Sequence, residues 1–433
     1  RDFNLEKDTL YDLIIAEVAA QRNQFNITLV NYILQARITR DPEIIKRAIN
    51  AAQLLKDIQA IQEMALLWAD VDAKSIPAHQ LLAFHYTLQK NYTEALLETE
   101  IVLNLGGEAR VDSLAVGSKQ LPEADQLELL ALYKALYERH SKNSEIGYSL
   151  ALVQKHLKQF EEALITLNPI LEHNPEFESA SILKINILYD QGNLNEALIL
   201  ADDAYDDFPK NHNLGRLYAS MLIENKQLDK AESVFKDLAE LYPQAPSLKL
   251  SYALVMLENK KIEPAKTTLL ELLNSGDHKN EANFYLGRIA DQNKDNPSAI
   301  KYYQQVKQSI HFEPALERSS FLLAKEEGKI DEAIKHLEAL RITQPQLALS
   351  LWLLQFKLLS TIEEEERALT TLDTAIKAYP TDEQLLYARA MIRETHNDLA
   401  GMESDLRTII QNNPQHAVAH NALGYTLANR TDR

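Results

Sequence analysis

Alanine recurs at a constant interval of 34 residues through the middle of the chain, and this period constrains the fold more than any other feature. Six consecutive positions carry it, at Ala163, Ala197, Ala231, Ala265, Ala299 and Ala333. Prolines stand twelve residues after four of these alanines, at Pro175, Pro209, Pro243 and Pro345. After one inserted residue the pairing returns as Ala368 with Pro380, and then as Met402 with Pro414. A fixed period of this length indicates a repeat protein, in which each repeat packs mainly against its neighbours.

Extended over the whole chain, this frame predicts twelve repeats and the start of a thirteenth. The repeats begin at Asp8, Pro42, Ile76, Arg110, Ser144, Glu178, His212, Pro246, Asn280, Pro314, Leu349 and Glu383, and the thirteenth begins at Ala417. Repeats one, two and four are degenerate, because they keep little of the pattern and glycines interrupt the fourth. We therefore group the chain into residues 1–143 with degenerate repeats, 144–416 with regular repeats, and 417–433. The last segment is a first helix whose second helix we expect beyond Arg433.

Each repeat contains two stretches with helical spacing of apolar residues. In the seventh repeat these stretches are residues 214–225 and 226–243, and the proline at Pro243 ends the second. A small residue such as Ala231 lets the two helices approach closely. No segment alternates apolar and polar residues in the way a half-buried strand does. The sequence therefore predicts an all-α protein.

Composition excludes several functional classes. The chain has 63 acidic and 45 basic side chains and a net charge of -18, so its average surface repels a phosphate backbone and predicts no nucleic-acid partner. Cysteine is absent, which removes disulfides and thiolate chemistry. No apolar run is long enough to span a membrane, and the first residues are neither a signal peptide nor an initiator methionine, so we expect the natural beginning to be missing.

The repeats resemble the tetratricopeptide repeat in length, in the small residue that opens the second helix and in the closing proline. Leu286 followed by Gly287 also matches the first-helix pattern of that family. The resemblance implies a right-handed α-solenoid superhelix whose inner surface is lined by the first helix of each repeat. It also implies a protein-binding surface on these helices, at Tyr148, Asn186, Tyr189, Arg216, Leu250, Leu254, Leu257, Phe284, Arg288, Arg318, Lys357 and Tyr387.

Part of this expected surface is apolar and part is cationic. The three leucines and Phe284 form an apolar strip in repeats eight and nine, and Arg288, Arg318 and Lys357 form a cationic strip in repeats nine to eleven. An amphipathic helix or extended peptide with acidic residues fits this pairing. The alternative is that the leucines pack between neighbouring repeats.

Motifs for catalysis or metal binding are weak. His416 and His420 lie four residues apart, but the first falls in a turn and no acidic residue completes a zinc-protease motif. The pair Gly106–Gly107 follows a helix and lacks the lysine of a phosphate-binding loop, so we interpret it as a turn. The acidic run 363–366 fits a solvated helix start. We expect no catalytic residues, no metal and no cofactor.

The ends of the chain are similar to repeat-containing outer-membrane lipoproteins of proteobacteria, over Leu10–Leu55 and again in the closing NALGYTLANRTDR. The resemblance implies a periplasmic adaptor, anchored to the outer membrane by a lipid on a cysteine before Arg1. Its expected partners are a carboxyl-terminal processing serine protease and the peptidoglycan hydrolases that the protease degrades. The alternative is a general scaffold that assembles envelope or secretion machinery without a protease.

Overall fold

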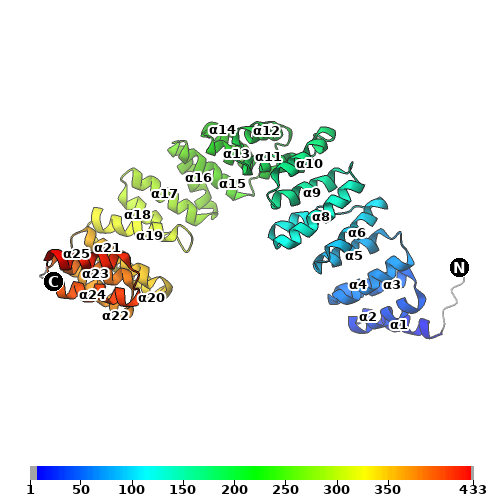
Figure 1. The fold of residues 1–433 in the computed structure, drawn as a ribbon, viewed down its shortest axis with the longest axis horizontal. Coiled ribbons are helices and arrows are strands. Elements are labelled where there is room, and N and C mark those ends of the chain that lie inside the picture. The colour runs from blue at the N-terminus through cyan, green and yellow to red at the C-terminus, as the bar shows by residue number, and fades with distance from the viewer. Residues whose placement is uncertain (1–6, 431–433) are drawn as a thin grey trace. The chain divides into compact units, whose positions relative to one another are not determined.

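The computed structural model describes residues 7–430, and these form α-helices joined by short turns, without a strand (Figure 1). The all-α prediction is confirmed, and the fold is a solenoid of helical pairs. Within the described residues, none of the helices combines the length and apolar character that crossing a bilayer requires.

The chain divides into two compact units, residues 1–221 and 222–433. Unit 1 contains α1 (Lys7–Gln21), α2 (Phe25–Thr39), α3 (Pro42–Leu55), α4 (Ile58–Val71), α5 (Ile76–Leu88), α6 (Tyr92–Asn104), α7 (Ser113–Gly117), η1 (Ser118–Gln120), α8 (Glu123–Arg139), α9 (Ser144–His156), α10 (Phe160–His173), α11 (Glu178–Asp190) and α12 (Leu194–Asp207). The boundary falls inside α13 (His212–Glu224). The grouping of repeats into 1–143, 144–416 and 417–433 stays a prediction.

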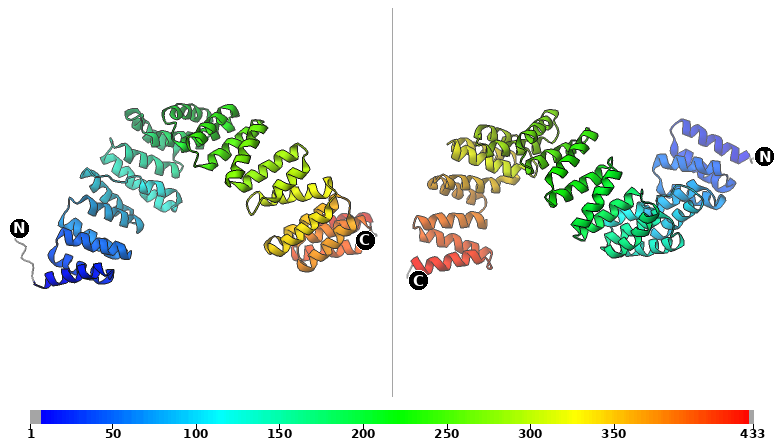
Figure 2. Two further views of the ribbon diagram at one scale, coloured as in Figure 1. Left: turned by 180° about the vertical axis from the view of Figure 1, so that it is seen from behind. Right: turned by 90° about the horizontal axis from the view of Figure 1, so that it is seen from above.

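Unit 2 has the same construction from helical pairs. It contains α14 (Leu228–Leu241), α15 (Pro246–Glu258), α16 (Ile262–Ser275), α17 (Lys279–Gln292), α18 (Asn296–Gln304), α19 (Phe312–Phe321), η2 (Leu322–Glu326), α20 (Ile330–Thr343), η3 (Pro345–Leu347), α21 (Ala348–Thr361), α22 (Glu365–Ala378), α23 (Glu383–Thr395), α24 (Leu399–Asn412) and α25 (Ala417–Arg430). Within each unit consecutive pairs stack side by side, as Figure 2 shows from two further directions.

Helix starts follow the predicted frame. Outside the fourth repeat, the first helix of every repeat begins within two residues of its predicted position, and α25 begins at Ala417 as expected. Repeats one and two form complete helical pairs although their sequences are degenerate. The residue inserted after the tenth repeat lengthens α21, which has 14 residues where α15 has 13, while four residues link α20 to α21 as they link α14 to α15.

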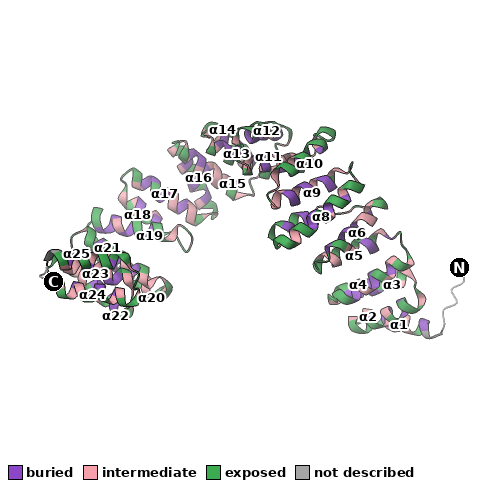
Figure 3. Cartoon of the chain, viewed as in Figure 1, coloured by how far each residue is buried: buried purple, intermediate pink, exposed green. Residues whose placement is uncertain are grey.

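The periodic alanines lie where helices meet. Ala163, Ala197, Ala231, Ala265 and Ala299 are all 0% exposed, because a neighbouring helix covers each of them. Figure 3 shows the buried residues gathered between helices and the exposed ones on the outer faces. A larger side chain at these positions would force the helices apart, since protein interiors are close-packed.

Two turns recur in the regular repeats. In six of the eight, a proline stands two residues after the last residue of the second helix, as Pro243 does after α14, where it cannot continue the helix. Two residues after the first helix, the backbone is left-handed, with φ of 82° at Gly192, 61° at Lys260 and 60° at Lys158. The turn geometry is therefore kept whether or not glycine is present.

The fourth repeat departs from this plan. Its first helix is reduced to α7, a helix of five residues, followed by the 3-10 turn η1. Its second helix, α8, is complete and covers Glu123–Arg139. The loop between α6 and α7 includes Gly106, whose φ is 74°. The predicted interruption of this repeat is confirmed.

Candidate functional site

The predicted inner-surface residues all lie on first helices, and none is fully buried. Unit 1 holds Tyr148 on α9, Asn186 and Tyr189 on α11, and Arg216 on α13. Unit 2 holds Leu250, Leu254 and Leu257 on α15, Phe284 and Arg288 on α17, Arg318 on α19, Lys357 on α21 and Tyr387 on α23. The four cations are exposed and the others are half-buried. Their role in binding a partner stays a prediction.

The apolar strip of unit 2 is partly used within the fold. Leu250 and Leu257 pack against a core cluster built by α15, α16 and α17. The ring of Phe284 stacks on the imidazole of His311, with centroids 4.4 Å apart and planes 17° from parallel. These contacts consume part of each side chain, so the strip offers less free apolar area than its sequence suggests.

The cationic strip is partly neutralised. Arg318 donates to both carboxylate oxygens of Asp291, and Lys357 pairs with Glu317. Arg288 lies over the ring of Tyr285, at 5.8 Å from its centroid, and has no ion pair within the described residues. Of the three cations, Arg288 is therefore the one whose charge is most available to a ligand.

A small cavity does lie beside one predicted residue. Lys357 lines a hollow of about 210 Å³ between α19 and α21, together with Phe312, Leu316, Leu351 and Leu354. Its walls are mostly apolar, and Lys357 and Glu317 stand on its edge.

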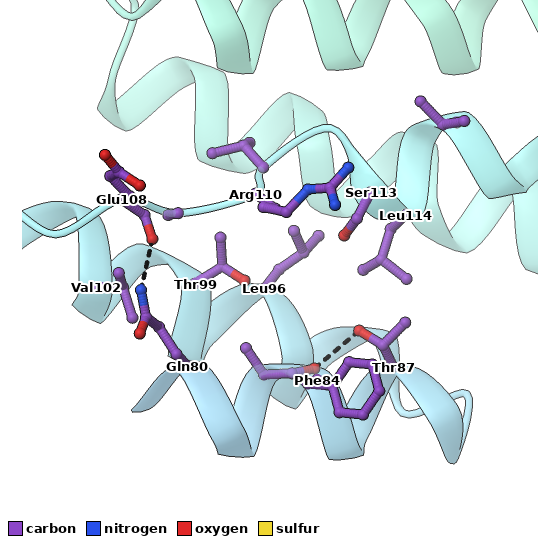
Figure 4. Close-up of a pocket in the computed structure, with 14 residues that line it drawn as sticks. Gln80, Phe84, Thr87, Leu96, Thr99, Val102, Glu108, Arg110, Ser113 and Leu114 are labelled. Carbon is purple, nitrogen blue, oxygen red and sulfur yellow. Dashed lines mark hydrogen bonds between the residues drawn. The ribbon is translucent and has the colours of Figure 1, made fainter. Parts of the chain in front are cut away.

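A larger cavity, of about 510 Å³, lies in unit 1 and was not predicted. It opens between α5, α6 and the loop that leads into α7, as Figure 4 shows. Its lining includes Phe84, Leu96, Val102, Leu114 and Val116. The related sequence signal is the glycine pair 106–107, which marks the break that removes most of a first helix but does not show that a cavity results.

Most polar groups around this cavity are already bonded within the fold. The amide of Gln80 donates to the carbonyl oxygen of Glu108 at 2.8 Å, and Thr87 and Thr99 donate to carbonyls one turn earlier in their own helices. In contrast, the guanidinium of Arg110 makes no hydrogen bond or ion pair with any residue of the described chain. The cavity is thus an apolar hollow with one unpaired cation on its wall.

One serine and histidine lie within hydrogen-bonding distance, although no such pair was predicted. Ser118 Oγ is 2.7 Å from Nδ1 of His156. The serine is 0% exposed and its hydroxyl donates to the carbonyl of Ala115, so a substrate cannot reach it. Burial, followed by the charges of Lys155 and Lys119, lowers the pKa of His156 to about 4. This pair is a structural contact between η1 and α9.

The other weak motifs have local roles. His416 accepts a hydrogen bond from the amide of Ala419 and lies 3.4 Å from Glu383, whereas Nε2 of His420 faces the carbonyl of Pro414. Across residues 7–430, no three His, Asp or Glu side chains are arranged to hold a metal ion. Glu365 and Glu366 lie in the first turn of α22, as the solvated-helix-start interpretation predicts.

Comparison with known proteins gives three kinds of match. The model of the tetratricopeptide repeat family matches residues 188–246. The TPR repeat-containing protein PA4667 of Pseudomonas aeruginosa is 40% identical over 430 residues, which are 99% of this chain and 72% of that protein. Solved structures that are similar include yeast Tom70, at 14% identity and a TM-score of 0.33, with 98% of this chain and 96% of that chain covered. Pseudomonas aeruginosa PilF is similar at 20% identity and a TM-score of 0.35, and the match covers 47% of this chain and 92% of PilF.

Proposed function

The chain belongs to the tetratricopeptide-repeat family, and from this premise we propose that it is a non-catalytic periplasmic adaptor for a carboxyl-terminal processing serine protease. Repeats of this family indicate a protein-interaction scaffold. In the finer proposal, the adaptor also binds peptidoglycan hydrolases and so promotes their degradation. The proposal also includes a lipid anchor that holds the assembly at the outer membrane.

The observation that carries this proposal is that each compact unit has its own apolar hollow beside its first helices. The hollow in unit 1 lies against α5 and the one in unit 2 lies between α19 and α21. Two partners can therefore be held on one chain without competing for the same surface. Holding protease and substrate together raises the effective concentration of each for the other, which is how a tether accelerates cleavage without new chemistry.

Sequence supports the choice of partner. The segment Leu10–Leu55 and the closing residues resemble the lipoproteins that include a protease adaptor. Within the described residues, the one serine found in contact with a histidine, Ser118, is buried, which favours a binding role over hydrolysis by the chain itself.

Affinity capture from envelope extract tests the proposal. The lipid-anchored full-length protein serves as bait, and mass spectrometry identifies what it retains. We expect a PDZ-containing serine protease together with cell-wall hydrolases, and in the purified mixture we expect faster hydrolase cleavage when the chain is present. Reproducible recovery of envelope assembly proteins without any protease would overturn the adaptor and favour a general scaffold.

A further inference from the structure

We propose that the cavity of the fourth repeat is a docking site for a peptide that inserts apolar side chains and places a carboxylate on Arg110. This inference deepens the adaptor function and rests on it in taking a polypeptide as the occupant. The site lies wholly in unit 1, and none of its residues is among those predicted for the inner surface.

The cavity exists because a helix is missing. In a regular repeat the first helix has about the length of α9, 13 residues, and it covers the second helix of the repeat before it. Here α7 has five residues, so part of α6 is left facing a hollow. Leu96 and Thr99 of α6 form its floor, as Figure 4 shows. The shortened helix thus converts a packing interface into a binding surface.

The walls define the chemistry of the occupant. The hydroxyls of Thr87 and Thr99 donate to backbone carbonyls, and the amide of Gln80 uses one of its two N–H groups in the same way, so these side chains offer a ligand only a few further hydrogen bonds. Apolar groups therefore fill most of the space favourably. Arg110 is exposed and forms no ion pair within the described residues, so its guanidinium is free to pair with a carboxylate of a ligand at the edge of the apolar hollow. Figure 4 shows Arg110 beside Ser113 at the α7 side of the cavity.

The volume of the cavity and the position of a second charge restrict further which ligands can bind. A volume of about 510 Å³ falls within the range of roughly 300–1,000 Å³ that is usual for ligand sites, and it exceeds what one aliphatic side chain fills. The rim residues Phe84 and Val116 are 59% and 56% exposed, so they are free to contact a bound segment. Glu108 also lines the cavity and disfavours a second carboxylate. A short helical or extended peptide with two apolar residues and one acidic residue fits these conditions.

A displayed library of random short peptides, selected on the full chain, tests the proposal. We expect enriched peptides to combine two apolar residues with a nearby Asp or Glu. Arg110→Glu should weaken their binding by about tenfold or more, because the attraction becomes repulsion. Replacing the acidic residue of the peptide by lysine should restore binding to the Arg110→Glu variant, and this rescue identifies a direct charge contact.

Matched variants separate the site from general effects. Phe84→Asp should abolish binding, whereas Ile165→Asp, at an apolar residue on α10 that is 71% exposed, should not. Arg22→Glu reverses an exposed arginine away from the cavity and controls for net charge. Circular dichroism of each variant verifies that it is folded. If the selected peptides bind wild type and Arg110→Glu equally, the proposal is overturned.

A second probe distinguishes a peptide from a lipid. Laurate also combines an apolar chain with a carboxylate, so Arg110-dependent binding of laurate without any selected peptide would overturn the proposal in favour of a lipid ligand.

The outcomes also separate this inference from the adaptor function. Undiminished protease and hydrolase capture by the Phe84→Asp variant would overturn the docking site alone, while peptide binding without protease capture by wild type would overturn the adaptor alone.

Discussion

Arg318 on α19 donates two hydrogen bonds to the carboxylate of Asp291 on α17, from Nε to Oδ2 at 2.6 Å and from Nη2 to Oδ1 at 2.7 Å. The hydrogen bond to Asp291 raises the pKa of the guanidinium, so the arginine stays charged. Because the two residues belong to the tenth and ninth repeats, the pair links successive repeats of unit 2. Its geometry indicates that Arg318 has a structural role in addition to any contact with a partner.

Reversing the charge of Arg318 should therefore destabilise unit 2. In Arg318→Glu the new carboxylate faces Asp291, whose side chain is 16% exposed, and we expect a loss of about 1 kcal/mol, since partial exposure of the arginine screens the interaction. Arg288→Glu, at a neighbouring cation without an ion pair in the described chain, is the matched control and should cost less. Urea unfolding followed by Trp352 fluorescence in a Trp68→Phe background measures both. Equal losses of unfolding free energy in the two variants would contradict a structural role for Arg318.

Gly107 is required by close packing in the loop that opens the unit 1 cavity. A Cβ atom there would lie 2.7 Å from Cγ2 of Ile76 and 3.0 Å from Cγ1 of Val102. We expect Gly107→Ala to destabilise the protein by roughly 1–3 kcal/mol, as overpacking usually does. Gly117→Ala is the matched control, because its Cβ would meet nothing within 4 Å and its backbone is helical. Thermal unfolding should show a lower midpoint for the first variant and an unchanged or higher one for the second.

Lysines in the left-handed turns carry a backbone strain that glycine would remove. Lys260 has φ of 61°, and the equivalent position of the sixth repeat is occupied by Gly192. Lys260→Gly should stabilise unit 2 by a few tenths of a kcal/mol up to about 1 kcal/mol, because a side chain disfavours this conformation. The same substitution within a helix, Lys236→Gly in α14, should destabilise by about 1 kcal/mol. A destabilised Lys260→Gly variant would show that the lysine side chain contributes more than the strain costs.

The helices could be predicted from the sequence because one period governs both contacts and turns. An alanine such as Ala231 must be small where two helices cross, and the proline that follows ends the second helix, so both appear at fixed positions. Ion pairs follow no such rule. Asp291 and Arg318 are 27 residues apart, and Glu317 and Lys357 are 40 apart, so the neutralisation of the cationic strip depends on how successive repeats pack.

In the fourth repeat, too, the sequence predicted the local structure but not how the parts pack. Its glycines predicted an interruption, and the structure confirms it. The cavity itself could not be predicted, because it depends on how far α7 extends and on which face of α6 is left uncovered. The availability of Arg110 likewise depends on how nearby carboxylates such as Glu108 are oriented, because none of them pairs with it in the described chain, and the sequence does not reveal this.

His156 should make the stability of unit 1 depend on pH in a defined window. Its folded pKa of about 4 lies below the ordinary value of about 6.5, because burial and the charges of Lys155 and Lys119 disfavour the imidazolium. Between these pH values the unfolded chain binds more protons than the folded one. The contribution of neutral His156 is therefore complete above about pH 6.5 and is lost as pH falls toward about 4.

The variant His156→Asn isolates this effect, because asparagine keeps a polar group near Ser118 and does not titrate. The stability difference between wild type and His156→Asn should shift against wild type as pH is lowered from about 6.5 to about 4. NMR titration of the His156 ring should give a midpoint near 4, and Lys119→Gln should raise that midpoint by removing one repelling charge. A wild-type midpoint at the ordinary value would mean that water reaches the ring, and the closed contact between η1 and α9 would then be wrong.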